Sequence, residues 1–299
     1  MKFINKKIVG IIGLGAMGMP IAQNLLKKKY IVYGYDIKNK LKAKLNKYKS
    51  FYFSMSVKDL CFKTNKVLII VENQYQCDSI IKTILNLRKK GLLNKKFLII
   101  CCSTVSASWI EKCEKLLFKN KIQLIDSPMS GGPSVAIKGN LSLMISGRKK
   151  TLLSAKKILK DISKKQFILG SKAGYGSKMK TVNQCLAGIH ILAAAEAIIL
   201  AKKQKLNPTK VLEVIKNSAG GSWMFNDRAP RMIKKSFNPP KSKINIFVKD
   251  MKIVNETLKK YKLSLPLSKA ALINYKKAKQ RKMGNLDDSS IVTFLNKKY

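Results

Sequence analysis

The first 170 residues of the chain alternate between short apolar runs and stretches with helical periodicity. The apolar runs are rich in Ile, Leu and Val, and several end at Gly or at a polar residue, as buried parallel strands do. We expect strands at residues 8–12, 31–35, 67–71, 97–101, 122–125, 141–146 and 166–169, with helices between them, the clearest at 20–28 and 106–118. Strands that alternate with helices predict an α/β domain with a Rossmann-type, doubly wound sheet over residues 1–170.

After Gly170 the strand-like runs stop, and helical periodicity continues to the end of the chain. We expect a long helix at residues 176–203 and further helices at 208–217, 244–261, 267–282 and 288–296. The most apolar part, residues 185–201, contains His190 and Glu196, which favours a buried helix over a membrane span. The sequence therefore predicts a long inter-domain helix and an all-helical C-terminal domain within residues 171–299.

The chain has 299 residues and a net charge of +46, which raises the question of a nucleic-acid partner. Of the 61 basic residues only five are arginine, the residue preferred for bidentate contacts with phosphates and bases. The lysines are spread along the whole chain and are not gathered on one element. We therefore expect weak, salt-sensitive binding of polyanions and no specific nucleic-acid partner.

The six cysteines form no CxxC pair, and the single histidine cannot complete a zinc site with them. The N-terminal segment lacks the uninterrupted apolar run and the small-residue cleavage site of a signal peptide. We therefore expect free thiols, no metal, no membrane association and a location in a reducing cytoplasm.

A loop between the first expected strand and the first expected helix has its glycines at the spacing GxGxxG. In such a loop the first glycine allows a tight turn, and the second allows the backbone to approach a pyrophosphate. The third allows helix and strand to pack closely, so that the helix N-terminus faces the phosphates. We expect this loop to bind a dinucleotide through Gly13, Leu14, Gly15, Ala16, Met17 and Gly18.

Asp36 follows the second expected strand. A carboxylate at this place accepts hydrogen bonds from ribose hydroxyls and repels a 2′-phosphate, which favours NAD over NADP. Lys38, Lys40 and Lys42 are close in sequence, and a nearby cation would tolerate the additional phosphate. NADP therefore stays the less favoured alternative.

A second glycine-rich loop, residues 126–134, leaves its strand at the carboxyl end, where ligands bind in open α/β sheets. Ser130, Gly131 and Gly132 can present a hydroxyl and unhindered amides to a carboxylate. A turn that binds no ligand is the alternative for this pattern. Thr104 lies just beyond another strand, at a place where a nicotinamide ribose can be contacted.

Lys180, Asn183 and Gln184 occupy positions i, i+3 and i+4 near the start of the long helix, so they share one helix face. Gly174 and Gly176 are expected to break the chain just before that helix. The helix dipole, partial burial and another lysine nearby all disfavour the ammonium form. We therefore predict that the pKa of Lys180 is lowered towards the range useful for proton transfer, whereas an ordinary solvated lysine is the alternative.

In this order and at this spacing, the motifs resemble the β-hydroxyacid dehydrogenase family over essentially the whole chain. The family includes 3-hydroxyisobutyrate dehydrogenase, tartronate semialdehyde reductase and 6-phosphogluconate dehydrogenase. Residues 184–190, 222–228 and 287–290 are most similar to the L-threonate dehydrogenases within it. The resemblance implies transfer of a hydride from the hydroxyl-bearing carbon of a small hydroxy acid, preferably L-threonate, to NAD.

The resemblance also implies roles in cofactor binding. The glycines of the first loop would hold the pyrophosphate and Asp36 the adenosine ribose. Thr104 and Lys249 would border the nicotinamide.

On the substrate side, the resemblance implies that residues 130–132 hold the substrate carboxylate and that Lys180 is the catalytic acid/base. The family usually has asparagine four residues after this lysine. The chain has Gln184 there, with Asn183 before it, and we interpret the change as tuning for the substrate, with both residues as candidates.

Two other functions remain open at this point. The chain could be a 3-hydroxyisobutyrate dehydrogenase or a short-chain semialdehyde reductase, such as one for tartronate semialdehyde. More remotely, it could be a polyanion-binding protein that keeps the fold without activity. Because helical domains of the family commonly pair subunits, the resemblance also implies a homodimer or a homotetramer.

Overall fold

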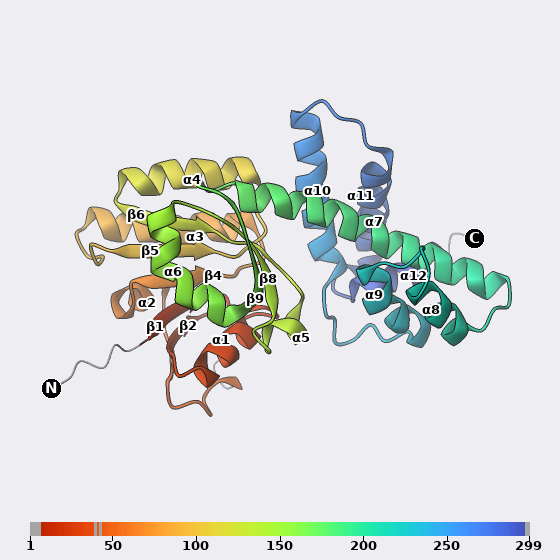
Figure 1. Ribbon diagram of the computed structural model, residues 1–299, viewed down its shortest axis with the longest axis horizontal. Helices are drawn as coiled ribbons and strands as arrows, with labels where there is room; N and C mark the ends of the chain where they lie inside the picture. The colour runs from red at the N-terminus through yellow and green to blue at the C-terminus, as the bar shows by residue number, and fades with distance from the viewer. Residues whose placement is uncertain (1–6, 39–40, 42–43, 297–299) are drawn as a thin grey trace. The chain divides into compact units, whose positions relative to one another are not determined.

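A computed structural model of the protein describes residues 7–38, 41 and 44–296 (Figure 1). The chain divides into two compact units, of which unit 1 ends at Lys180 and unit 2 begins at Thr181. Unit 1 is a Rossmann-like domain built on a mixed sheet, and the described part of unit 2 is helical, so the predicted fold class is confirmed.

Within the described residues of unit 1, nine strands form one sheet, and six of them are parallel in the order β3-β2-β1-β4-β5-β6. β8 then pairs antiparallel with both β6 and β7 and parallel with β9. The strands are β1 (Ile8–Ile12), β2 (Ile31–Tyr35), β3 (Phe51–Phe53), β4 (Lys66–Ile69), β5 (Phe97–Cys101), β6 (Ile122–Asp126), β7 (Met129–Ser130), β8 (Leu141–Ser146) and β9 (Ser163–Gly170). The strand order reverses at β1, which lies between β2 and β4, and such a reversal opens a crevice at the carboxyl ends of the strands.

The strand predictions need correction at four places. β9 begins at Ser163, three residues before the predicted start. β4 ends at Ile69, two residues before the predicted end, because the amide of Val71 leaves the ladder and donates to Ser103 Oγ at 2.8 Å. β3 and β7 were not predicted, since their three and two residues are too few to show the alternation of a strand.

Helices cover both faces of the sheet, α3 and α4 on one face and α1 and α6 on the other (Figure 1). Their buried residues, such as Ile21 and Leu25 of α1, form two separate hydrophobic clusters, one on each face. The helices of unit 1 are α1 (Gly18–Lys27), α2 (Val57–Lys63), α3 (Gln74–Lys89), α4 (Ala107–Lys119), α5 (Pro133–Ala136) and α6 (Lys149–Ile162). Side chains satisfy free amides at the starts of α2 and α3, through Ser56 before α2 and the capping box of Asn73 and Gln76 at α3.

Unit 2 buries one hydrophobic cluster among its helices, and α10 and α11 lie side by side (Figure 1). Its elements are α7 (Tyr175–Lys203, begun in unit 1), α8 (Pro208–Lys216), α9 (Trp223–Lys234), α10 (Ile244–Lys260), α11 (Pro266–Ala278), η2 (Lys279–Met283), η3 (Asp288–Ser290) and α12 (Ile291–Asn296). The predicted helix at 267–282 is therefore shorter, because a π-helical turn follows Ala278 and Lys282 has a φ of 60°.

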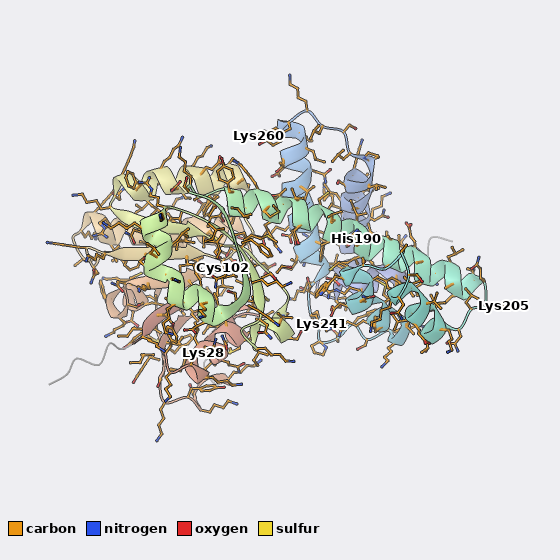
Figure 2. The ribbon with its side chains drawn as sticks, in the orientation of Figure 1. Lys28, Cys102, His190, Lys205, Lys241 and Lys260 are labelled. Atoms are coloured by element: carbon orange, nitrogen blue, oxygen red, sulfur yellow. The ribbon has the colours of Figure 1, made fainter. Side chains whose placement is uncertain are left out.

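α7 is a single helix of 29 residues. Among the described residues it is the helix long and apolar enough to cross a membrane by length and composition alone. Ile191, Ala195 and Ile198 of α7 are instead fully or almost fully buried in the hydrophobic cluster of unit 2, as in a core helix. His190 lies about midway along it (Figure 2).

Lysine closes several helices in the left-handed conformation that glycine usually supplies. Where α3 ends, Gly91 has a φ of 69°. Lysines with φ between 50° and 61° stand at the ends of five other helices, namely Lys29 (α1), Lys121 (α4), Lys205 (α7), Lys235 (α9) and Lys262 (α10). Lys205, just past the end of α7, is labelled in Figure 2.

Candidate active site

A cavity of about 870 Å³ opens in unit 1 beside the loop between β1 and α1. The predicted cofactor residues that line it are Gly13, Leu14, Gly15, Ala16 and Asp36. Its other lining residues include Ile37 and Val71, which follow β2 and β4, and Tyr75 of α3. The cavity therefore lies where the strand order reverses, as expected for a dinucleotide site.

The three glycines of the loop differ in what surrounds them. Gly13 has a φ of 97°, and a Cβ added there would lie 2.2 Å from the carbonyl oxygen of Ile70. A Cβ on Gly18 would lie 1.8 Å from the carbonyl oxygen of Gly13. Nothing lies within 4 Å of a Cβ placed on Gly15, which lines the cavity. Gly13 and Gly18 thus make the tight turn possible, and Gly15 leaves backbone open to a ligand, so the loop fits a pyrophosphate.

Asp36 is tied to the same loop. Its Oδ2 accepts a hydrogen bond from the amide of Leu14 at 2.7 Å, and its Oδ1 accepts one from the amide of Lys38 at 2.9 Å. Each carboxylate oxygen keeps a further lone pair, so both can also accept from ribose hydroxyls. Lys38 lines the cavity, whereas Lys40 and Lys42 lie outside the described residues.

The second glycine-rich loop reaches the cavity only at its end, and its candidate residues Ser130, Gly131 and Gly132 are not among the described residues that line it. Ser130 ends β7, and Gly131 and Gly132 have φ values of 133° and 74°. Pro133 and Ser134, which follow directly, line the cavity. The unusual backbone of the two glycines thus turns the chain from β7 into α5.

Three other predicted cofactor residues, Met17, Gly18 and Thr104, are not among the described residues that line the cavity. Ser103, the residue before Thr104, has a structural role, since its Oγ accepts a hydrogen bond from the backbone amide of Val71.

Lys180 is buried, with 7% of its surface exposed. Two residues before it, Lys178 is half exposed and forms an ion pair with Glu111 at 2.8 Å. The two neighbouring lysines therefore differ in environment, since Lys180 is buried and Lys178 is not. The prediction of a lowered pKa stays a prediction.

Asp126, at the end of β6, fixes the start of the helix that carries Lys180. Its Oδ2 accepts from the amides of Gly174 at 2.9 Å and Ser177 at 2.8 Å, and its Oδ1 accepts from Ser177 Oγ at 2.8 Å. Ser146 Oγ donates to Oδ2 at 3.3 Å and accepts from the amide of Gly176 at 3.0 Å. A strand end thereby satisfies the first amides of α7, which are unpaired within any helix.

Burial raises the pKa of Asp126, although hydrogen bonds from Ser177, Gly174 and Ser146 lower it in part. Gly176 does not break the chain as predicted but is the second residue of α7. Its role is close packing, because a Cβ there would lie 2.3 Å from the carbonyl oxygen of Met144 in β8.

In unit 2, a fourth residue joins three predicted site residues. Asn183 Nδ2 donates to Gln184 Oε1 at 2.9 Å, and Gln184 Nε2 donates to Asp250 Oδ2 at 2.5 Å. Lys249 Nζ lies 2.6 Å from Asp250 Oδ1, an ion pair without the angle of a hydrogen bond. The buried carboxylate of Asp250 thus connects the candidate substrate residues to the candidate cofactor residue.

Sequence reasoning missed Asp126 and Asp250 as parts of the site. Asp126 is the first residue of the second glycine-rich loop and Asp250 adjoins Lys249, but their hydrogen-bond partners Ser177 and Gln184 are 51 and 66 residues away. The one available signal is a charge at the end of an apolar run, as at Asp126 after Leu124 and Ile125.

Two family models match the chain one after the other. The NAD binding domain of 6-phosphogluconate dehydrogenase matches residues 8–170. The model described as NAD-binding of NADP-dependent 3-hydroxyisobutyrate dehydrogenase matches residues 174–295.

Curated relatives match over nearly their whole length. L-threonate dehydrogenase of Cupriavidus necator is 34% identical over 284 residues, which cover 95% of this chain and 94% of that protein. L-threonate dehydrogenase of Pectobacterium atrosepticum is 30% identical over 296 residues, covering 99% and 96%. Among solved structures, one described as 3-hydroxyisobutyrate dehydrogenase from Salmonella typhimurium has a TM-score of 0.87 at 29% identity and covers 96% of this chain and 99% of its own.

Proposed function

The chain belongs to the 3-hydroxyisobutyrate dehydrogenase family of β-hydroxyacid dehydrogenases, and from this we propose that it oxidises L-threonate with NAD. That it is a dehydrogenase of the hydroxyacid family follows from the full-length matches. L-threonate as substrate is supported by the names of these relatives. The reaction itself rests on one observation above all, the burial of Lys180 on a helix whose start is fixed.

Lys180 acts as the general base in the proposed mechanism. Its neutral amine accepts the hydroxyl proton of the substrate while the C–H bond on the same carbon breaks and the carbonyl forms. NAD, when bound, accepts the hydride at its nicotinamide ring. In the reverse direction the ammonium of Lys180 returns the proton to the carbonyl oxygen. Because Asp126 fixes the start of α7, the position of Nζ along the helix is set before substrate binds.

The choice of NAD over NADP is supported by Asp36. A carboxylate whose two oxygens already accept from Leu14 and Lys38 is held against the cavity wall, where it repels a 2′-phosphate. We propose that Gly13, Gly15 and Gly18 hold the pyrophosphate and that Lys249 borders the nicotinamide.

A second candidate function is favoured by one observation. The Salmonella structure described as 3-hydroxyisobutyrate dehydrogenase aligns with nearly the whole chain at 29% identity. The same Lys180 chemistry would then act on an acid that carries a methyl group.

The test is NADH formation with a panel of hydroxy acids, namely L-threonate, glycerate and 3-hydroxyisobutyrate, each offered with NAD and with NADP. We expect selective turnover of L-threonate, with NAD preferred at least about tenfold in kcat/KM, which corresponds to about 1.4 kcal/mol. Turnover of 3-hydroxyisobutyrate instead would move the conclusion to the second candidate. Preference for NADP would contradict the role given to Asp36.

The chain offers a matched pair of variants for the mechanism. Lys180→Met should lower kcat by about 10²–10⁴-fold while dinucleotide binding is kept. Lys178→Met removes an exposed lysine two residues away, and because an exposed ion pair contributes at most about 1 kcal/mol, activity should stay within about fivefold. Near-normal kcat for Lys180→Met would remove Lys180 from the mechanism.

A further inference from the structure

The hydrogen bonds around Asn183 and Gln184 run in one direction. Asn183 donates to Gln184, and Gln184 donates to Asp250, so both amides point their NH₂ groups towards the carboxylate. Gln184 has 8% and Asp250 2% of its surface exposed, whereas Asn183 is half-buried. We call these hydrogen bonds, from Asp250 through Gln184 to Asn183, the series. It begins at the buried carboxylate of Asp250 and ends at the more accessible side-chain amide of Asn183.

Asp250 determines this direction. An ionised carboxylate can only accept hydrogen bonds, so Gln184 must offer its Nε2, which leaves Oε1 on the opposite side of the amide. Oε1 is likewise an acceptor, so Asn183 must offer its Nδ2. The carbonyl oxygen of Asn183, Oδ1, is then the terminal group of the series, and reversal of either amide would place two acceptors against each other.

Lys249 makes the buried charge tolerable. A carboxylate as buried as Asp250 needs a counter-ion, and Lys249 Nζ lies 2.6 Å from its Oδ1. The charge in turn polarises the two amides, since hydrogen bonds in series strengthen one another in a low-dielectric environment. Asn183 Oδ1 is thereby a stronger acceptor than the oxygen of an isolated asparagine.

We propose that Asp250 is a positioning residue for substrate recognition, which orients Gln184 and Asn183 so that Asn183 Oδ1 accepts a hydrogen bond from a hydroxyl of a polyhydroxylated acid. This inference rests on the proposed function and supplies the polar partners that the additional hydroxyls of L-threonate require. A methyl group cannot donate to Oδ1 and would leave this acceptor desolvated and unpaired. The series therefore selects polyhydroxylated acids over acids that carry a methyl group.

The charge of Asp250 is tested by Asp250→Asn, which keeps the size of the side chain. An asparagine can offer either an oxygen or an NH₂ group, so Gln184 and Asn183 are no longer held in one orientation. The measured quantity is the ratio of kcat/KM for L-threonate to that for 3-hydroxyisobutyrate. We expect it to fall at least tenfold through KM for L-threonate, with kcat changed little, because proton transfer at Lys180 is not touched.

Two further variants separate orientation from stability. Glu256→Gln removes one negative charge from an exposed position on the same helix and should leave the ratio unchanged. The double variant Asp250→Asn/Gln184→Glu moves the carboxylate from position 250 to position 184. Asn183 still donates to a carboxylate in this variant, so Oδ1 again ends the series and the ratio should recover.

A merely structural role for Asp250 predicts a different result, namely equal loss for both substrates and no recovery in the exchanged pair. Either finding overturns the inference. Should Asp250→Asn not fold, Asn183→Ala removes the terminal acceptor at a half-buried position and must lower the ratio by itself; an unchanged ratio there also overturns the inference.

Calorimetric binding of the two acids to the wild type distinguishes this inference from the proposed function. Selective binding of L-threonate that Asp250→Asn abolishes, without turnover, upholds the inference and removes the proposed function. Turnover of both acids at equal kcat/KM by the wild type keeps a dehydrogenase and overturns the inference. Failure to bind either acid overturns both.

Discussion

In unit 1 the loop between β1 and α1 is shaped by backbone atoms, whereas in unit 2 the turns near the C-terminus are held by charged side chains. Arg228 contacts Asp288 through Nε at 2.6 Å and Nη2 at 2.9 Å, and it also bonds to Asp227. Arg231 Nε lies 3.2 Å from Asp287 Oδ1. We call these five residues the Arg228 cluster; Arg228 has 7% of its surface exposed, and Asp287 and Asp288 have none.

The two regions are sensitive to different changes. In the loop, Gly13 and Gly18 have backbone oxygens at distances where no side chain fits, so added volume is the damaging change. In the Arg228 cluster, buried charges compensate each other, so a change of charge is the damaging one. The comparison teaches that the effect of a conservative substitution depends on whether close backbone packing or compensating buried charges hold the region together.

The largest effect is expected from Arg228→Met. This variant keeps much of the volume but leaves Asp288 buried without its guanidinium, so the free energy of unfolding at pH 7 should fall by about 3–5 kcal/mol. Chemical denaturation of the full chain measures the change. Lys210→Met, which breaks an exposed pair with Glu213, is the control and should change stability by less than about 0.5 kcal/mol. Equal effects of the two variants would contradict the charge argument.

The pH dependence of stability gives the next largest effect. Burial raises the pKa of Asp288 from 3.8 to about 6, although Arg228 lowers it in part. The folded protein therefore binds this proton more tightly than the unfolded chain, so the contribution is fully present below pH 3.8 and is lost as the pH rises through about 6. The difference between these two pKa values corresponds to a contribution of about 3 kcal/mol to the free energy of unfolding.

Urea denaturation between pH 4 and pH 7 measures this contribution as the difference between wild type and Asp288→Asn, since asparagine does not titrate. The wild type should lose more stability with rising pH than the variant. Parallel curves for the two proteins would show that Asp288 does not titrate in this range.

Two glycine variants, of which Gly15→Ala has the smallest expected effect on stability, sharpen the comparison within the loop itself. A methyl group on Gly18 would lie 1.8 Å from a backbone oxygen, so Gly18→Ala should lower the free energy of unfolding by up to about 3 kcal/mol and abolish dinucleotide binding. Gly15→Ala meets nothing within 4 Å and should fold with wild-type stability, within about 0.5 kcal/mol.

The two glycine variants should nevertheless share a loss of cofactor binding. The methyl group of Gly15→Ala would stand between the backbone and a pyrophosphate, so dinucleotide Kd should rise at least about tenfold. Titration with NAD, beside denaturation of each variant, separates the two effects. Unchanged NAD binding by Gly15→Ala would place the pyrophosphate elsewhere.

The same contrast explains how much the sequence could predict. The glycine loop is local, with its spacing and its flanking strand and helix within a few residues, and β1, β2, β5 and β8 have the predicted bounds. The networks of Asp126, Asp250 and Arg228 join residues 51, 66 and 60 positions apart, respectively. Nothing in a single sequence pairs such residues, because the pairing depends on how the helices and strands pack.

Some residues were singled out correctly from the sequence but were given the wrong structural role. Gly176 was read as a chain break from its type alone, whereas the approach of β8 requires it. In the sequence, Lys180 could be singled out only by the glycines before it and the two amides after it. Its burial, by which it differs from Lys178, depends on packing and could not be predicted.

The lysines in the left-handed conformation have a consequence for engineering. An L-residue in this conformation costs about 1 kcal/mol relative to glycine, so the backbone disfavours lysine at these positions. Exchange for glycine would recover about 0.5–1 kcal/mol at each place, after allowance for the more flexible unfolded chain. The five positions are Lys29, Lys121, Lys205, Lys235 and Lys262. None of the five is among the described residues that line the cavity or form the networks of Asp126 and Asp250, so we expect these exchanges to give a more stable and less basic protein with unchanged activity.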